Sequence, residues 1–309
     1  MNEFQLIARL APHLPTNKTV VTASGDDCAV LDFGLPNELF LFKTDATVEG
    51  VHFTPETAPE KIGHKALARC LSDVAAMAGT PAAALVTLGL PPAFDAAFVE
   101  RIYGGLNALA RRYEVAVVGG ETTTNHGRLF ISIALLGTVG RGRQVLRSGA
   151  RVEDAIFVTG ELGGSILGKH LEFEPRIAEA KWLADHFPIH AMVDLSDGLA
   201  GDLRWILGPA HVGAEIRKSS IPVSRAAKSQ ERKSHGKSAI GAALTDGEDF
   251  ELLFTVAGGD AVKLLDAWKR QFPKLKLTCI GKIVHGSGIS VRDKDTLQKL
   301  DAHGYVHFA

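Results

Sequence analysis

The chain has 309 residues, of which 46 % are hydrophobic and 22 % charged, a balance typical of globular proteins of about two domains. Its 34 Lys and Arg and 35 Asp and Glu leave a formal net charge of -1, which argues against a nucleic-acid-binding protein and against an acidic disordered chain. The longest apolar stretches, near 82–92 and 129–139, are shorter than the ~20 residues of a membrane helix. Three scattered cysteines without a CxxC pair, and an N-terminus without signal-peptide character, predict a protein of the reducing cytoplasm with no membrane partner.

Apolar runs alternate with stretches of helical periodicity, which predicts mixed α/β structure. In the first half, strands are expected at 28–33, 39–43, 83–90, 115–119 and 129–139, with helices at 59–79 and 94–113. A linker rich in Gly and Arg, 140–149, leads to strands at 155–159 and 250–256 and helices at 175–187, 199–207 and 261–272. The segment 218–238, which is rich in Lys and Arg, is expected to be an exposed loop or a short helix.

Acidic residues recur beside Gly, Ser or Thr at the ends of the expected strands and helices. Such neighbours let a ligand approach the backbone, and carboxylate and hydroxyl oxygens suit hard cations such as Mg²⁺. Taken singly, each site also fits an ordinary turn, a solvated helix face or a helix cap. Their number favours a nucleotide-phosphate site bridged by several Mg²⁺ ions. The six sites are centred on Asp27, Asp45, Asp73, Glu121, the pair Asp194 and Asp197, and the run Asp246–Asp249.

Other nucleotide-binding signatures are absent from the sequence. There is no GxxxxGK[ST] motif of a P-loop protein and no protein-kinase motif set. Arg147 lies where the linker meets the second half, and its guanidinium can either bind a polyphosphate or belong to an ordinary surface arginine. A distributed carboxylate set without a P-loop therefore has to be explained by another kind of phosphate site.

The ordered motifs resemble those of thiamine-monophosphate kinases, of the aminoimidazole-ribonucleotide-synthetase-like superfamily that also includes selenophosphate synthetases. The resemblance covers nearly the whole chain. It includes GDDCAV at 25–30, TD at 44–45, EGVHF at 49–53, LSDVAAMA at 71–78, GG at 119–120, RSG at 147–149, DLSDGL at 194–199 and GEDFEL at 247–252. Any one motif is weak evidence, but the ordered set is specific.

The resemblance implies a two-domain α/β (α+β) fold and a homodimer. Residues 1–139 would form an ATP- and Mg²⁺-binding dimerisation domain whose strands build a β-barrel across the dimer interface, and residues 140–309 a C-terminal α/β domain that closes the active-site cleft. The reaction implied is transfer of the ATP γ-phosphoryl group to thiamine monophosphate, with several Mg²⁺ ions. The implied metal ligands are Asp27, Thr44, Asp45, Asp73, Glu121, Asp194 and Asp197. The implied ATP contacts are Gly120, Glu121, Arg147, Ser196 and Tyr103, the acceptor contacts His52 and Glu248, and the catalytic residues Asp45, Arg147 and Asp197.

Three residues depart from the family pattern. Lys43 stands where the family usually has Ser, and we expect its ammonium either to replace one metal ion by pairing with Asp27 and Asp73 or to point to solvent. Glu121 replaces an Asp, which lengthens the side chain by about 1.5 Å and predicts an activity that is reduced or retuned but not lost. Ala302 replaces a Trp that would pack on the thiamine rings. Two alternatives therefore stay open: a different phosphate acceptor, or a catalytically degenerate nucleotide-binding homodimer.

Overall fold

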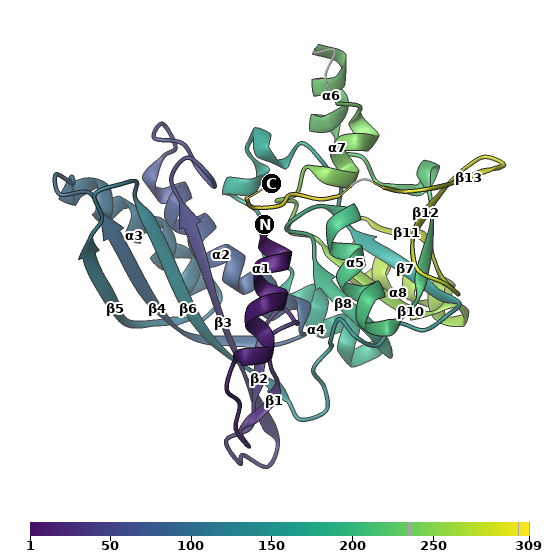
Figure 1. Cartoon of the computed structure of the whole chain (residues 1–309), viewed down its shortest axis with the longest axis horizontal. Helices are drawn as coiled ribbons and strands as arrows, with labels where there is room; N and C mark the ends of the chain where they lie inside the picture. Colours follow the sequence, from purple (N-terminus) through teal and green to yellow (C-terminus); the bar gives the residue numbers. More distant parts are fainter. Residues whose placement is uncertain (234–236, 302, 309) are drawn as a thin grey trace. The chain divides into compact units, whose positions relative to one another are not determined.

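A computed structural model describes residues 1–233, 237–301 and 303–308, and the chain divides into two compact units. The N-terminal unit comprises Lys18–Gln144 and Gly168–Ile177, and the C-terminal unit comprises Met1–Asn17, Val145–Leu167 and Ala178–Ala309. Each unit combines one β-sheet with helices (Figure 1), which confirms the expected mixed α/β fold of two parts. Within the described ranges, none of the helices is both long and apolar enough to cross a membrane.

The N-terminal unit contains a six-stranded sheet with the strand order β1-β2-β3-β6-β4-β5. Neighbouring strands are antiparallel except β4 and β5, which run parallel. Strands β1 and β5 are the two edges, so the sheet is open and does not close into a barrel within one chain. The strands are β1 (Val20–Thr22), β2 (Ala29–Leu31), β3 (Glu38–Val48), β4 (Thr80–Leu90), β5 (Ala116–Thr124) and β6 (Phe130–Gly140).

Helices α2 (Pro59–Ala76) and α3 (Ala96–Arg112) belong to this unit, and α2 packs on the central strands of the sheet. The two helices approach each other closely at glycines, because a Cβ on Gly63 would lie 1.9 Å from the Ile102 carbonyl oxygen and one on Gly105 would lie 1.8 Å from that of Glu60. Side chains alternate along β3, with Leu39 and Leu41 buried on the helix side. The expected helices at 59–79 and 94–113 are thus confirmed, with shorter ends.

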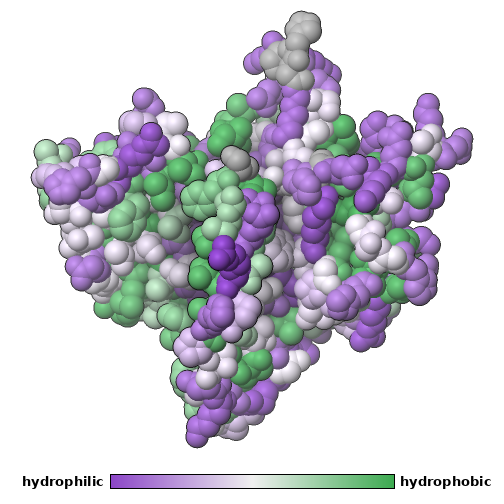
Figure 2. All heavy atoms as spheres, viewed as in Figure 1, coloured by the Kyte–Doolittle hydropathy of each residue, from purple (hydrophilic) through white to green (hydrophobic). Residues whose placement is uncertain are grey.

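The other face of this sheet is not covered by a helix of the unit. Phe42 of β3, Leu85 of β4 and Val118 of β5 are 48 %, 46 % and 63 % exposed. Figure 2 shows hydrophobic side chains interspersed with polar ones over the part of the molecule where these strands lie. An uncovered sheet face with large apolar residues is a typical interaction surface.

The C-terminal unit contains a seven-stranded sheet with the order β13-β12-β9-β11-β7-β10-β8, in which only β9 and β12 run parallel. The strands are β7 (Asp154–Thr159), β8 (Ile189–Asp194), β9 (Gly213–Arg217), β10 (Leu252–Ala257), β11 (Leu277–Val284), β12 (Gly288–Asp293) and β13 (Thr296–Lys299). The helices are α1 (Glu3–Leu10), α4 (Ile177–His186), α5 (Leu199–Ala210), α6 (Arg225–Lys233), α7 (Ala239–Thr245) and α8 (Ala261–Gln271). Apolar residues of β7, β8, β10, β11 and α5 form the core.

The described part of the expected exposed segment at 218–238 contains a 3₁₀ turn, Lys218–Ser220, and helix α6, which projects from the top of Figure 1. Within α6, Ala227 is buried and the other side chains are exposed or half-buried. The short-helix interpretation is therefore correct for the part of the segment that the structure describes. Residues 234–236 lie outside that part.

Candidate functional site

Two charged residues of β3 face helix α2 in the N-terminal unit. Strand alternation puts Lys43 and Asp45 on the same side as buried Leu41. The Lys43 ammonium lies 3.0 Å from a carboxylate oxygen of Asp73 on α2. Arg69, one helical turn earlier, donates two hydrogen bonds of 3.0 Å each to the two carboxylate oxygens of Asp45. The α2 face that packs on β3 therefore carries charged side chains as well as apolar ones.

Asp27 lies next to this charged layer. One of its carboxylate oxygens is within 4.8 Å of one of Asp73, and both side chains are buried. Burial lowers the pKa of Lys43, but the charges of Asp73 and Asp45 outweigh it and raise the pKa above its usual value. Burial, followed by the charge of Asp73, raises the pKa of the neighbouring Cys28 thiol, which keeps that thiol neutral.

The donor set at Asp27 and Asp73 fits a hard divalent cation. Two buried carboxylates with oxygens this close repel each other unless a positive charge lies between or beside them. Lys43 supplies one positive charge, which leaves the pair with a net negative charge. Oxygen donors of this kind suit Mg²⁺. Of the two orientations expected for Lys43, the one that points to solvent is therefore wrong. Its ammonium pairs with Asp73, one of the two expected carboxylates.

Three other predicted residues lie in the same sheet, Thr44 on β3 and Gly120 and Glu121 on the edge strand β5. Thr44 alternates with Lys43 and Asp45, and its hydroxyl lies 3.3 Å from that of Ser132 on β6. Glu121 on β5 pairs in register with Thr87 of β4, which in turn pairs with Ser132. The register thus places the Thr44 and Glu121 side chains on one face of the sheet, away from the face that carries Asp45 and packs on α2.

Gly120 shows why a glycine precedes Glu121. It has a φ of +155°, and a Cβ would lie 1.8 Å from the carbonyl oxygen of Val86 on the parallel neighbour β4. Only glycine permits this approach without displacing backbone. The Gly-Gly motif therefore brings β5 close to β4 and leaves the peptide groups before Glu121 accessible.

The loop after β3 holds His52 in a fixed orientation. The His52 Nδ1 accepts a hydrogen bond of 3.0 Å from the Val48 amide, so in the neutral ring Nε2 carries the proton and is the donor. The Lys65 ammonium donates to the His52 carbonyl oxygen at 2.6 Å and lies 2.7 Å from Nδ1 of His170. Lys65 is fully buried. The sequence prediction missed Lys65, although a lysine inside the apolar stripe of the expected helix was a usable signal.

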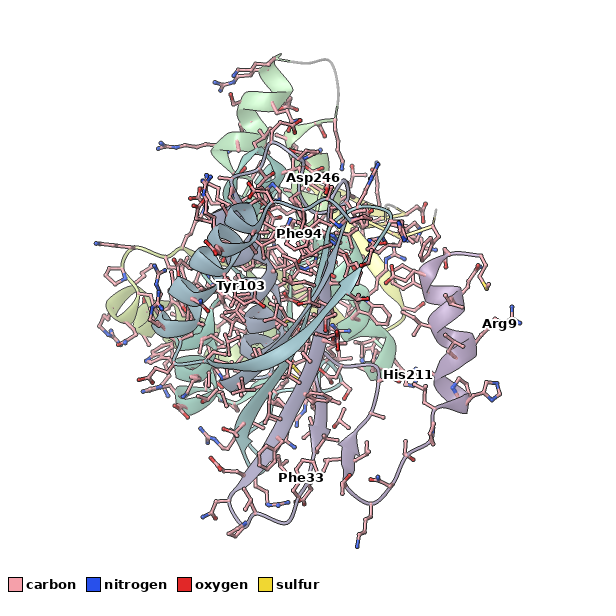
Figure 3. The ribbon with its side chains drawn as sticks, turned by 90° about the vertical axis from the view of Figure 1, so that its left-hand side faces the viewer. Arg9, Phe33, Phe94, Tyr103, His211 and Asp246 are labelled. Atoms are coloured by element: carbon pink, nitrogen blue, oxygen red, sulfur yellow. The ribbon has the colours of Figure 1, made fainter. Side chains whose placement is uncertain are left out.

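Tyr103 lies on helix α3, labelled in Figure 3. It is half-buried, and burial raises the pKa of its hydroxyl. Helix α3 contacts α2 through Gly105 and Ile102. In the described part of the chain, no hydrogen bond joins Tyr103 to Asp45 or Asp73. The role of Tyr103 in a nucleotide pocket therefore stays a prediction.

In the C-terminal unit, two loops carry four of the predicted residues. Asp194 is buried at the end of β8, and the turn that follows carries half-buried Ser196 and Asp197. The backbone amide of Glu248 donates to the Ser196 carbonyl oxygen at 2.6 Å. Gly247 has a φ of +73°, and a Cβ there would lie 2.7 Å from that same oxygen. The Asp-Leu-Ser-Asp and Gly-Glu-Asp motifs, distant in sequence, are thus adjacent in this unit.

A further carboxylate lies under this turn. Asp202, in the first turn of α5, is buried, and its carboxylate accepts a hydrogen bond of 3.0 Å from the Asp197 amide. Burial, then the charges of Asp197 and Asp194, raise the pKa of Asp202 well above its usual value, while Arg147 lowers it. The charge of Arg147 therefore acts on a carboxylate that lies under this turn. The sequence prediction missed Asp202, which lies three residues after Leu199 and four before Ile206 on the buried stripe of α5.

The glycine-rich turn after β7 is held by two more buried acids. Both carboxylate oxygens of Asp249 accept from the Gly163 amide, at 3.0 and 2.9 Å. Glu251 accepts from the Thr159 hydroxyl at 2.8 Å. Because these carboxylates are occupied by hydrogen bonds inside the unit, the Gly-Glu-Asp motif serves both to build the turn and to present Glu248.

Comparison with known proteins extends these observations to the whole chain. Residues 25–139 match the family described as AIR synthase related protein, N-terminal domain. A thiamine-monophosphate kinase of Rhodopirellula baltica is 38 % identical over 93 % of this chain and 92 % of its own length, and that of Escherichia coli K12 is 35 % identical over 99 % and 98 %. The solved structure of AaThiL complexed with AMPPCP and TMP superposes with a TM-score of 0.84 at 32 % identity and covers 99 % of this chain and 97 % of that one. The chain belongs to the thiamine-monophosphate kinase family.

Proposed function

We propose that this protein transfers the γ-phosphoryl group of ATP to thiamine monophosphate and forms thiamine diphosphate and ADP. The observation that carries the proposal is full-length similarity to proteins named thiamine-monophosphate kinases, together with a solved relative in complex with AMPPCP and TMP. The phosphate-binding residue types that the reaction needs are present in both units of the chain.

The acidic residues fit several Mg²⁺ ions. We assign Asp27, Asp45 and Asp73 of the N-terminal unit to this role, with Thr44 and Glu121 on the other sheet face, and Asp194 and Asp197 of the C-terminal unit. When bound, Mg²⁺ neutralises charge on the transferred phosphoryl group. Buried or half-buried carboxylates held by neighbouring hydrogen bonds are suited to this task, since little reorganisation is needed on binding.

The acceptor needs no strong general base. Its attacking group is a phosphate oxygen, and a phosphate monoester is largely ionised near pH 7 because its second pKa is about 6. The barrier is the approach of two polyanions, which positioning and charge neutralisation lower. Arg147 supplies a fixed positive charge for the ATP phosphates. The Nε2–H group of His52 is held as a donor for the acceptor phosphate, and Glu248 lies in the turn against Ser196.

We further propose that the uncovered sheet face of the N-terminal unit pairs with that of a second copy. Its apolar residues Phe42, Leu85 and Val118 support this assignment, as does the open edge at β5. Two such sheets facing each other would form a barrel across the dimer. Burial of these side chains gives the association a hydrophobic driving force.

The test is an assay of ADP release with ATP, Mg²⁺ and thiamine monophosphate, with the product identified by chromatography. Turnover that requires thiamine monophosphate and is lost in Asp197→Asn supports the proposal. Because Ala302 stands where an aromatic residue would pack on the thiamine rings, a panel of other phosphate acceptors is tested beside it. Residue 302 lies outside the described residues. Faster turnover with another acceptor, or nucleotide binding without any turnover, would contradict the proposed activity.

A further inference from the structure

Trp205 of helix α5 lies against the guanidinium group of Arg147. The Arg147 Cζ is 5.4 Å from the centroid of the indole ring. Arginine stacks on aromatic faces through its planar, weakly hydrated guanidinium, whose N–H groups point along the guanidinium plane and not toward the ring. Both side chains are half-buried. The contact therefore restricts the conformations of the long Arg147 side chain.

A second partner of Trp205 is Phe4 of the N-terminal helix. The two ring centroids are 5.5 Å apart with an interplanar angle of 59°, an arrangement that aromatic pairs favour. Helix α1 has no fully buried residue, so it is not retained by deep core packing. Its contact with Trp205 is one of the interactions that hold it on the unit. Figure 1 shows α1 beside α5.

The C-terminal segment of the chain ties α1 to the functional turn. The Glu3 amide donates to the His307 carbonyl oxygen at 3.3 Å. Two residues earlier, the Tyr305 amide donates to the Asp197 carbonyl oxygen at 2.9 Å. The N-terminal helix and the C-terminal segment are thus connected to Asp197 on one side and, through Phe4 and Trp205, to Arg147 on the other.

We infer that Trp205 is a positioning residue that holds the Arg147 guanidinium ready for the nucleotide phosphates, and that Phe4 of α1 keeps Trp205 in place. The inference rests on the proposed function insofar as Arg147 binds the phosphates of ATP. A guanidinium that is already oriented loses less conformational freedom on binding, so the affinity for the nucleotide rises. The gain in nucleotide affinity depends on Arg147, because Trp205 acts only by orienting the Arg147 side chain.

The experiment measures the affinity of the full-length protein for AMPPCP with Mg²⁺ by isothermal titration calorimetry. We expect Trp205→Leu to weaken binding by about 3- to 30-fold, the range of a cation–π contact, and Trp205→Phe to retain most of the affinity. Phe4→Ala weakens binding less. In an Arg147→Ala background, Trp205→Leu has no further effect. The control, Trp182→Leu, disturbs an aromatic cluster with Trp268 elsewhere in the same unit and leaves the affinity unchanged.

Melting temperatures of each variant show whether a loss of affinity follows from unfolding. An equal effect of Trp205→Leu with and without Arg147 would overturn the inference, and so would unchanged affinity in Trp205→Leu. Failure of the proposed function looks different. If the protein makes no thiamine diphosphate, but Trp205→Leu still weakens AMPPCP binding only when Arg147 is present, the positioning role stands and the reaction assignment falls.

Discussion

The ammonium of Lys43 and the carboxylate of Asp73 form an ion pair 3.0 Å long inside the N-terminal unit, with side chains 25 % and 9 % exposed. The pair puts a permanent positive charge beside two acids, Asp27 and Asp73, that we assign to Mg²⁺ binding. A charge fixed by the chain lowers the need for a cation from solution at the same place. We therefore propose that Lys43 takes the place of one metal ion.

Replacement of Lys43 by serine tests this role. Without Mg²⁺, we expect Lys43→Ser to lower the free energy of unfolding by about 1–3 kcal/mol, because Asp73 is left buried without its ammonium partner. Added Mg²⁺ then stabilises the variant more than it stabilises the wild type, measured as the shift in melting temperature across a Mg²⁺ titration. The control is Lys61→Ser, which breaks an exposed pair with Glu172 and costs at most about 1 kcal/mol. Equal stabilisation of variant and wild type by Mg²⁺ would show that Lys43 does not stand in for an ion.

His52 is expected to contribute to acceptor binding and not to nucleotide binding. Loss of a hydrogen bond to a charged group costs about 1.5–3 kcal/mol, so His52→Ala raises the KM for thiamine monophosphate by roughly 10- to 100-fold and leaves the KM for ATP within about twofold of wild type. Steady-state kinetics with each substrate varied in turn measures both values. Exposed His126 provides the matched control, His126→Ala. A rise in the KM for ATP alone would reject the assignment.

The contact between α2 and α3 depends on Gly105. A Cβ there would lie 1.8 Å from the Glu60 carbonyl oxygen, whereas at the adjacent Gly104 no atom lies within 4 Å. Gly105→Ala therefore forces the helices apart and lowers the melting temperature. Gly104→Ala raises it slightly, since alanine favours a helix over glycine by about 0.5–1 kcal/mol. Thermal unfolding of the pair, monitored by circular dichroism, distinguishes them, and a similar stability of both variants would contradict the packing described for α2 and α3.

The proposed dimer depends on the uncovered sheet face. Val118→Asp puts a charge at a position that is 63 % exposed in one chain, where burial against a second chain would make that charge costly. Light scattering after size-exclusion chromatography is expected to give the mass of a dimer for the wild type and of a monomer for the variant. Val262 on α8 is 71 % exposed in the other unit, and Val262→Asp is expected to leave the mass unchanged. A wild-type monomer would reject the dimer.

Much of the fold follows from sequence periodicity, as α2 illustrates. The apolar residues Leu67, Leu71 and Val74 recur at helical spacing and are all fully buried. Strand β3 was expected only at 39–43, yet it runs over Glu38–Val48. Its second half carries Lys43 and Asp45 at inward positions, where charge interrupts the apolar pattern. Arg69 and Asp73 of α2 compensate these charges, and such tertiary pairing is invisible to local propensity.

The same limit applies to the functional residues. The motifs named Asp194, Asp197 and Glu248, and the structure brings their turns together. Asp202 and Trp205 were not predicted, because their roles arise from contacts with residues brought near only by the fold, the Asp197 amide and the Arg147 guanidinium. Six strands were also missed, namely β1, β8, β9, β11, β12 and β13. Of these, β9, β12 and β13 mix polar with apolar residues over a few positions and so have no distinctive period.

The most direct measurement follows the label of [γ-³²P]ATP in a reaction with Mg²⁺, thiamine monophosphate and the purified protein. We expect the label to appear in thiamine diphosphate in step with ADP formation, and Asp197→Asn to abolish the transfer. Label that remains in ATP, or that is released only as inorganic phosphate while the protein stays folded and binds nucleotide, would contradict this expectation.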